Sequence, residues 1–206
     1  MNNHKLLGCL VLGSMMLLSS AAFAEVLKIK SVTANGSGCP TGSASTLVMD
    51  TNYDGKADFF QVSYAEFVAE RPGTATKNCM ITVQVEVPRG IQFSILTVES
   101  KGYADISEVH KGVFTTSYDF AFAGGTQRTQ GTLTGPYAGE FGKLDRFPAP
   151  SWSPCNQNFP LNINNRIAIQ KNPSVTYENG YYSVMQVDRT SGMFTQLFAI
   201  TWQPCH

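Results

Sequence analysis

Apolar and polar residues alternate along most of this chain, and that period-two pattern constrains the fold more than any other feature. The clearest example is Cys79 to Val87, where every second residue is apolar and Thr82, Gln84 and Glu86 lie between them. Side chains of a β-strand point alternately to its two faces, so this segment predicts a strand with one buried and one wet face. Helical periodicity is hard to find anywhere in the 206 residues.

Other segments with strand character are 26–33, 45–50, 58–69, 91–100, 112–123, 127–135, 160–170, 181–189 and 194–203. Turn dipeptides such as Asp54-Gly55 and Asn179-Gly180 separate them. About ten short strands with such turns predict an all-β fold, a single antiparallel β-sandwich of jelly-roll or Ig-like type. No repeat, charge block or linker divides the chain.

Residues 1–24 predict a secretory signal peptide. Lys5 supplies a positive start, residues 6–18 form an apolar stretch, and residues 22–24 form an A-x-A cleavage site. The apolar stretch is shorter than the roughly 20 residues that a spanning helix needs. We therefore expect a secreted domain of residues 25–206, extracellular or periplasmic, with no transmembrane segment after cleavage.

Removal of the signal peptide leaves four cysteines: Cys39, Cys79, Cys155 and Cys205. An even number in an oxidising compartment predicts two disulfides, with three pairings open. None of the four lies in a C-x-x-C motif, which argues against a zinc site or a redox-active dithiol. We favour Cys39–Cys79 and Cys155–Cys205, because each would tether a loop or terminus to a nearby strand.

The charge balance limits the classes of partner. Fifteen basic residues face fifteen acidic ones, whereas a nucleic-acid binder should carry a basic surplus that neutralises phosphates. Nucleic acid is therefore not an expected partner. The hydrophobic content of 43% is enough to fill a core and excludes a disordered chain.

An oxygen-rich segment predicts a calcium site. Oxygen side chains at alternate positions followed by Gly55 can curl around a hard cation such as Ca²⁺. The expected ligands are Asp50, Asn52, Asp54, the backbone carbonyl of Lys56, and Asp58. An EF-hand would need helical flanks and a Glu where this chain has Gln61, so the segment is more similar to the calcium loops of extracellular β-hairpins. The alternative is a polar hairpin turn, because Asp, Asn and Gly are also common turn residues.

The stretch 136–160 interrupts the alternation, and its prolines disfavour regular strand pairing. Loops of this length inside compact domains are often functional. It carries five aromatic residues: Tyr137, Phe141, Phe147, Trp152 and Phe159. Either the stretch folds over one end of the sandwich and buries these rings, or it forms a ligand-binding lid. In the second case Tyr137 and Trp152 are the predicted ligand-binding residues.

Catalytic machinery has little support in the sequence, and no catalytic residue is assigned. His110, beside Glu108, has the context of an exposed, solvated histidine, and no G-x-S-x-G motif accompanies it. Paired carboxylates for glycoside hydrolysis could come from acids on or near the predicted strands, although a wet sheet face explains them equally well. These acids are Glu66, Glu70, Glu86, Glu99 and Asp119.

Short motifs follow one another along the whole mature chain: Asn35-Gly36-Ser37-Gly38-Cys39-Pro40, Phe67-Val68-Ala69-Glu70, Lys77-Asn78-Cys79, Lys101-Gly102-Tyr103-Ala104, Ser153-Pro154-Cys155, Leu161-Asn162-Ile163-Asn164, and Trp202 with Cys205. With the four-cysteine framework they resemble a family of secreted proteins from fungi and bacteria, domain of unknown function 4360. The resemblance implies a secreted, disulfide-bonded β-sandwich and supplies no activity. Lys101 stands where the family more often has Arg. The Asp50–Asp58 segment is richer in acids than the family's usual turn, so calcium cannot be carried over from the family.

Three hypotheses for function follow. The first is a non-enzymatic exported module that binds a ligand or surface, such as a glycan or another cell-envelope component. The second is an extracellular polysaccharide hydrolase that uses paired carboxylates, and the third is an envelope or matrix protein that self-associates through exposed edge strands. Export, the disulfides, the aromatic stretch and the missing nucleophile–base set favour the first.

Overall fold

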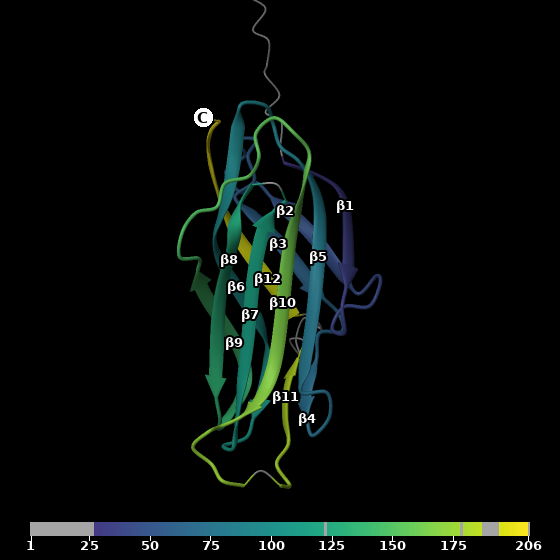
Figure 1. Cartoon of the computed structure of the whole chain (residues 1–206), viewed down its shortest axis with the longest axis vertical. Helices are drawn as coiled ribbons and strands as arrows, with labels where there is room; N and C mark the ends of the chain where they lie inside the picture. Colours follow the sequence, from purple (N-terminus) through teal and green to yellow (C-terminus); the bar gives the residue numbers. More distant parts are fainter. Residues whose placement is uncertain (1–26, 122, 178, 187–193, 206) are drawn as a thin grey trace, which may run out of the picture.

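The computed structural model describes residues 27–121, 123–177, 179–186 and 194–205 (Figure 1). The predicted signal peptide of residues 1–24 lies outside them. The described residues form strands and no helix. The strands are β1 (Lys28–Asn35), β2 (Ala44–Met49), β3 (Phe59–Tyr64), β4 (Ala69–Arg71), β5 (Thr76–Glu86), β6 (Ile91–Ile106), β7 (His110–Phe120), β8 (Ala123–Thr134), β9 (Tyr137–Arg146), β10 (Phe159–Lys171), β11 (Ser183–Gln186) and β12 (Phe194–Pro204).

The strands form two antiparallel sheets packed face to face, which confirms the predicted β-sandwich. One sheet has the order β1-β5-β10-β7-β8, and the other has the order β2-β3-β12-β6-β11-β4, with β9 added to β6. Both sheets run along the long axis of the molecule, and the five-stranded sheet lies in front in Figure 1. The outer face of the five-stranded sheet is therefore turned toward the viewer.

Strand β6 organises the second sheet. It pairs with β12 along Ile91–Lys101 and with β9 along Thr97–Ile106, so these two strands lie on opposite edges of β6. Past the first residues of β12, the short strand β11 pairs with the same edge of β6, along Tyr103–Asp105. Strand β4 then pairs with β11. This arrangement brings β4, far away in sequence, to the lower end of the sandwich in Figure 1.

The expected count of about ten strands is corrected to twelve in the described part of the chain, for two local reasons. The predicted strand 58–69 is split into β3 and β4 by a turn. Strand β9 occupies residues 137–146, where no regular strand was expected. Most residues of β9 are exposed or half-buried, and Phe141 is its one buried residue. An edge strand with so little buried surface does not need alternating hydropathy, so its sequence carries no period-two signal. The remaining irregular stretch is 147–158.

The core lies between the sheets and consists of the inward side chains that the alternation predicted. From the five-stranded sheet come Ile81, Val83, Val85, Leu161 and Ile163, and from the second sheet come Phe60, Val62, Phe93, Ile95 and Phe198. Aromatic pairs are frequent in this core. Phe93 makes an edge-to-face contact with Phe120 at a centroid distance of 5.1 Å, and it also packs against Trp202 at 5.4 Å. Trp202 is thus packed against the core.

Both favoured disulfides are confirmed. Cys39–Cys79 joins the segment after β1 to β5, and Cys155–Cys205 joins the 147–158 stretch to the end of β12. Each therefore fixes an irregular segment to the framework of a sheet.

A buried polar network, which no sequence pattern predicted, crosses the interior. The Tyr64 hydroxyl on β3 donates to Gln196 Oε1 on β12 at 2.9 Å and accepts a hydrogen bond from the Asn165 side-chain amide on β10. Gln196 in turn donates to Thr116 Oγ1 on β7 at 2.7 Å. These four side chains are at most 2% exposed. Because β3 and β12 belong to one sheet and β7 and β10 to the other, the network connects the two layers.

Candidate functional site

A hollow of about 740 Å³ opens at the lower end of the sandwich, and it is the candidate functional site. Its lining comes from two segments that are far apart in sequence: Arg71, Pro72, Gly73 and Ala75 from β4 and the turn after it, and Asn179, Gly180, Tyr181 and Tyr182 from the approach to β11. A volume of this size lies within the range of roughly 300–1,000 Å³ that is usual for ligand-binding clefts. We call it the end hollow.

Strand pairing brings the two sides of the end hollow together. Arg71 is the last residue of β4, and it lies opposite Ser183, the first residue of β11. Both segments turn sharply next to this pair, because Gly73 and Gly180 adopt positive φ angles of 138° and 84° that favour glycine. The turn after β4 and the segment before β11 therefore separate from each other next to this pair, and the end hollow lies between them.

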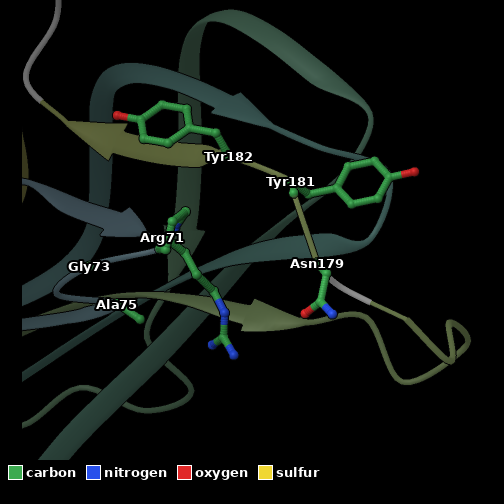
Figure 2. Close-up of a pocket in the computed structure, with 8 residues that line it drawn as sticks. Arg71, Gly73, Ala75, Asn179, Tyr181 and Tyr182 are labelled. Atoms are coloured by element: carbon green, nitrogen blue, oxygen red, sulfur yellow. The ribbon is translucent and has the colours of Figure 1, made fainter.

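Figure 2 shows how the side chains of the end hollow lie. The rings of Tyr181 and Tyr182 point away from each other, whereas the side chains of Arg71 and Asn179 extend toward the same side. Tyr182 is 53% exposed, and the neighbouring Tyr177 is 62% exposed. The end hollow thus combines a guanidinium and an amide with accessible aromatic rings at its margins.

The hydroxyls of Tyr181 and Tyr182 stay protonated at physiological pH, because the pKa of each is raised, so they can donate hydrogen bonds. Hydrogen bonding to Tyr177 and to Glu108 raises the pKa of Tyr181 to about 12. Its hydroxyl donates to Glu108 Oε1 at 3.0 Å. The pKa of Tyr182 is also raised, first by desolvation and then by the negative charge of Glu70.

His110 is buried and contacts Ser183, next to the tyrosines of the end hollow, which corrects the expectation of an exposed histidine. The ring has no exposed surface, because β7 begins at His110 and enters the interior directly. Its Nδ1 lies 2.9 Å from both Ser107 Oγ and Ser183 Oγ, and Ser183 Oγ also accepts the Ser107 backbone amide at 2.8 Å. Since Ser183 directly follows Tyr182, this cluster anchors the tyrosine segment. His110 and Ser183 are both fully buried, so a substrate cannot reach either of them.

Tyr137 and Trp152, the predicted ligand-binding residues, lie elsewhere. Tyr137 opens β9, packs against the core, and donates its hydroxyl to the Glu140 carbonyl at 2.6 Å. Trp152 is half-buried in the 147–158 stretch. The other three rings of the aromatic stretch, Phe141, Phe147 and Phe159, are buried in the core. Most of these rings therefore stabilise the sandwich, and the assignment of Tyr137 and Trp152 to ligand binding stays a prediction.

The residues of the predicted calcium site form a loop between β2 and β3 that is closed by its own hydrogen bonds. The Asp58 carboxylate accepts the backbone amide of Thr51 at 2.7 Å and also its hydroxyl. These bonds, the side-chain bond from Thr51 first, lower the pKa of Asp58. Asp50 accepts the Gly55 amide at 2.9 Å, and Asp54 accepts the Lys56 amide at 2.8 Å.

A hydrogen bond fixes the same loop to the core, and one carboxylate oxygen of the loop has no hydrogen-bond partner. Ala57 is buried, and its carbonyl accepts a hydrogen bond from Trp202 Nε1 at 2.7 Å. Asn52 Oδ1 accepts the Asp54 amide, so it is engaged as well. Asp50 Oδ1 is buried without a hydrogen-bond partner. Among the described residues, no three His, Cys, Asp or Glu side chains gather closely enough to form a metal cluster, and calcium binding stays a prediction.

The strand carboxylates considered for hydrolysis are dispersed. Glu86 lies on β5 of the five-stranded sheet, where hydrogen bonding to Lys30 lowers its pKa. A general acid needs the opposite shift. Glu99 lies on β6 of the other sheet and forms an ion pair with Lys101 at 3.1 Å. Asp119 accepts a hydrogen bond from Asn162, and Glu66 and Glu70 are exposed.

Sequence reasoning missed Arg71 and Asn179 as site residues. Arg71 precedes the turn dipeptide Pro72-Gly73, and Asn179 belongs to the turn dipeptide Asn179-Gly180, so turn chemistry alone explained both positions. Tyr181 and Tyr182 fall at the start of the predicted strand 181–189; in the structure they precede β11, which begins at Ser183, and their rings point in opposite directions (Figure 2). The three tyrosines at 177, 181 and 182 could have indicated a binding surface from the sequence. The position of Arg71 next to them follows only from the pairing of β4 with β11.

The chain belongs to the family defined as domain of unknown function DUF4360, whose match covers residues 25–205. An uncharacterised secreted protein from the fungus Arthroderma benhamiae is 30% identical over 191 residues, which span 88% of this chain and 73% of that protein. The family match confirms the resemblance seen in the sequence. The protein is secreted, since its relative is a secreted protein and its two disulfides fit an extracellular environment.

Two solved structures align with most of this chain at low similarity. TmCBM61 in complex with β-1,4-galactotriose aligns with 85% of this chain and 90% of its own length, at 7% identity and a TM-score of 0.33. The enzymatically active domain of tailspike protein 4 from bacteriophage CBA120 aligns with 85% of this chain and 19% of its own, at 11% identity and a TM-score of 0.25. At such TM-scores neither neighbour bears on the function of this chain. Within the described part of the chain, no helix is long and apolar enough to cross a membrane.

Proposed function

We propose that this protein is a secreted, non-enzymatic binding module and that the end hollow takes a glycan of the cell envelope or its surroundings. The observation that carries the proposal is the composition of the end hollow. A cleft of about 740 Å³ joins a guanidinium, an amide and accessible tyrosine rings in one place. Ligand sites typically combine apolar or aromatic surface with a small number of convergent polar groups.

Glycan chemistry fits these groups. Sugar rings expose both C–H faces, which pack on aromatic rings, and hydroxyls, which need donors and acceptors. Tyr182 supplies an exposed ring, and its protonated hydroxyl supplies a donor. Arg71 and Asn179 extend toward one side, where they can meet hydroxyl or carbonyl oxygens. The buried His110 cluster holds the tyrosine segment in place, which limits the ordering cost of binding.

The test is binding of the purified secreted protein to a panel of soluble and insoluble polysaccharides, followed by calorimetric titration of any that bind. Arg71→Ala and Tyr182→Ala should each weaken binding at least tenfold. Tyr53→Ala, which changes a tyrosine that is 91% exposed at another part of the surface, is the matched control and should bind normally.

A double variant, Tyr137→Ala with Trp152→Ala, separates the end hollow from the site predicted from the sequence. Loss of binding in this variant alone would move the site to β9 and the 147–158 stretch. Failure of the unmodified protein to bind any polysaccharide would reject the proposal, and turnover of a polysaccharide would replace it with the hydrolase hypothesis.

Calcium in the Asp50–Asp58 loop is a secondary proposal with a structural role. It is supported by the alternating oxygen residues and by Asp50 Oδ1, which is buried and has no hydrogen-bond partner. A cation there would replace some of the hydrogen bonds that now close the loop, so we expect weak binding of the order of 10⁻³ M, as in extracellular modules.

At 5 mM Ca²⁺ such a site stabilises the fold by about 1 kcal/mol. Thermal unfolding in EDTA and then in Ca²⁺ should show this rise, and Asp54→Ala should lack it; equal melting temperatures in both conditions would refute it.

A further inference from the structure

The outer face of the five-stranded sheet carries a second hollow, which is distinct from the end hollow. Its volume is about 330 Å³, and it crosses four neighbouring strands. Every lining side chain is polar: Asn78 from β5, Asn164 and Arg166 from β10, Thr115 and Ser117 from β7, and Thr126 and Arg128 from β8. We call it the sheet hollow. It lies on the face turned toward the viewer in Figure 1.

Strand register places the two arginines on opposite sides of the sheet hollow. Arg166 lies opposite Thr115, and Arg128 lies opposite Ser117. Since Thr115 and Ser117 are two residues apart on β7, all four side chains share one face of the sheet. Two strand spacings and one two-residue step separate the Cα atoms of Arg128 and Arg166 by about 12 Å. Thr115 is 8% exposed and lies at the floor between them.

The positive charge of the sheet hollow is not neutralised by the protein. Within the described residues, neither Arg128 nor Arg166 has a hydrogen bond or an ion pair, and no acidic side chain lines the hollow. Asp119, the acid that follows Ser117 by two residues on β7, is engaged elsewhere. It accepts the Asn162 amide at 2.9 Å, and Asn162 Oδ1 accepts the Thr82 hydroxyl at 3.0 Å. These cross-strand bonds hold Asp119 in the adjacent row of the sheet.

We infer that the sheet hollow binds an anionic polysaccharide, whose carboxylate or sulfate groups pair with Arg128 and Arg166. A guanidinium binds such groups with two parallel hydrogen bonds. The two positions are separated enough to take successive anionic groups of one extended chain. The amides and hydroxyls between them, from Asn164, Thr115 and Ser117, can bond to sugar hydroxyls.

A polysaccharide fits this surface better than a nucleic acid. Proteins that bind single strands stack bases on aromatic rings, and none of the described residues that line the sheet hollow is aromatic. The chain also has no excess of basic residues, which a phosphate backbone would require. The inference does not rest on the end hollow, because the two hollows share no residue.

The test uses polygalacturonate and dextran sulfate as anionic probes and unmodified dextran as the neutral control, in titrations with the purified secreted protein. At least one anionic polymer should bind, neutral dextran should not, and added salt should weaken the complex. Arg128→Gln with Arg166→Gln should reduce the affinity by about tenfold or more, because charge-assisted hydrogen bonds are lost. Both arginines are exposed, so the double variant should keep the melting temperature of the unmodified protein.

Two controls make the result specific. Arg146→Gln removes an exposed arginine from β9 of the other sheet and should leave the affinity unchanged. Arg89→Gln removes an exposed arginine from the turn between β5 and β6 and should also leave it unchanged. The two proposals can fail separately, because the double arginine variant keeps every residue that lines the end hollow. Preference for uronate or for sulfate identifies the anionic group. The inference is overturned if the double arginine variant binds as tightly as the unmodified protein, if neither anionic polymer binds, or if single-stranded DNA binds more tightly than both.

Discussion

Replacement of Tyr64 by Phe should destabilise the sandwich strongly, although it removes a single oxygen atom. The Tyr64 ring has no exposed surface and packs against Phe67 at a centroid distance of 5.1 Å. Phe keeps that ring and creates no cavity of significant size. The change therefore isolates the hydroxyl, which donates to Gln196 Oε1 and accepts from the Asn165 amide. Burial raises the pKa of Tyr64 well above its usual value, so the hydroxyl carries its proton throughout the accessible pH range.

The magnitude follows from the two partners that lose the hydroxyl. Gln196 and Asn165 are each 1% exposed, so water cannot replace the missing oxygen without opening the core. A buried donor or acceptor left unsatisfied costs about 1–3 kcal/mol. Two such groups give an expected loss of about 2–6 kcal/mol, which is a large part of the 5–15 kcal/mol that is usual for a domain. The Asn165 side chain is sensitive to this loss, because its Oδ1 already has no partner.

Urea unfolding followed by intrinsic fluorescence measures the free energy of unfolding with the disulfides intact. Tyr137→Phe is the matched control, because it removes a hydroxyl that bonds locally to the Glu140 carbonyl at an exposed site. It should cost less than about 0.5 kcal/mol. A double-mutant cycle with Asn165→Leu should show a coupling energy of about 0.5–3 kcal/mol. A loss below about 1 kcal/mol for Tyr64→Phe would refute the argument that the network is buried and closed.

Three further predictions concern the cross-links, the packing and the pH dependence. Alanine replacement of both cysteines of the C-terminal disulfide, whose sequence separation is 50, should lower the free energy of unfolding by about 4 kcal/mol; denaturant midpoints check this, and a loss below about 1 kcal/mol would contradict it. Gly131→Ala would overlap the Phe114 ring and should cost about 1–3 kcal/mol, whereas Gly125→Ala on the same strand meets nothing and should be nearly neutral in thermal unfolding. Bonds from Thr51 lower the folded pKa of Asp58, so its carboxylate stabilises the fold above the unfolded pKa of about 3.9 and this contribution disappears as the pH falls through the folded value. The difference in urea midpoint between the unmodified protein and Asp58→Asn should therefore be present at pH 7 and vanish at strongly acidic pH, and a constant difference would contradict it.

The sandwich could be predicted from local sequence because burial of one sheet face imposes alternation on each strand separately. Strand β5 shows this directly: its buried positions, Cys79, Ile81, Val83 and Val85, are all apolar, and Met80 is the one apolar side chain of this strand that is exposed. The disulfide pairing was also within reach, since it follows from which irregular segments lie near strands. Strand β9 escaped because an exposed edge strand has little apolar surface to bury, and glycine interrupts its pattern at Gly139 and Gly142.

Individual residues show the limit of the same reasoning. A histidine close to acids in a turn-like segment favours an exposed position, yet His110 is buried, with its ring satisfied by Ser107 and Ser183. Ser183 is 73 residues away from His110, and no local sequence pattern predicts that the two meet. The carboxylates of the predicted calcium site accept hydrogen bonds from backbone amides of their own loop, which no local pattern indicated, and cation binding there stays a prediction.

The sequence by itself thus determined the all-β class, the faces of most strands, the cross-linked secreted character and the family. Only the tertiary structure decided where functional groups meet. The end hollow exists because β4 pairs with β11 and places Arg71 beside Tyr182, and the sheet hollow exists because β10, β7 and β8 align Arg166 with Arg128. Alternation depends on neighbours two residues apart, whereas these groups meet through the register of strands that are distant in the chain, which is a property of long-range pairing.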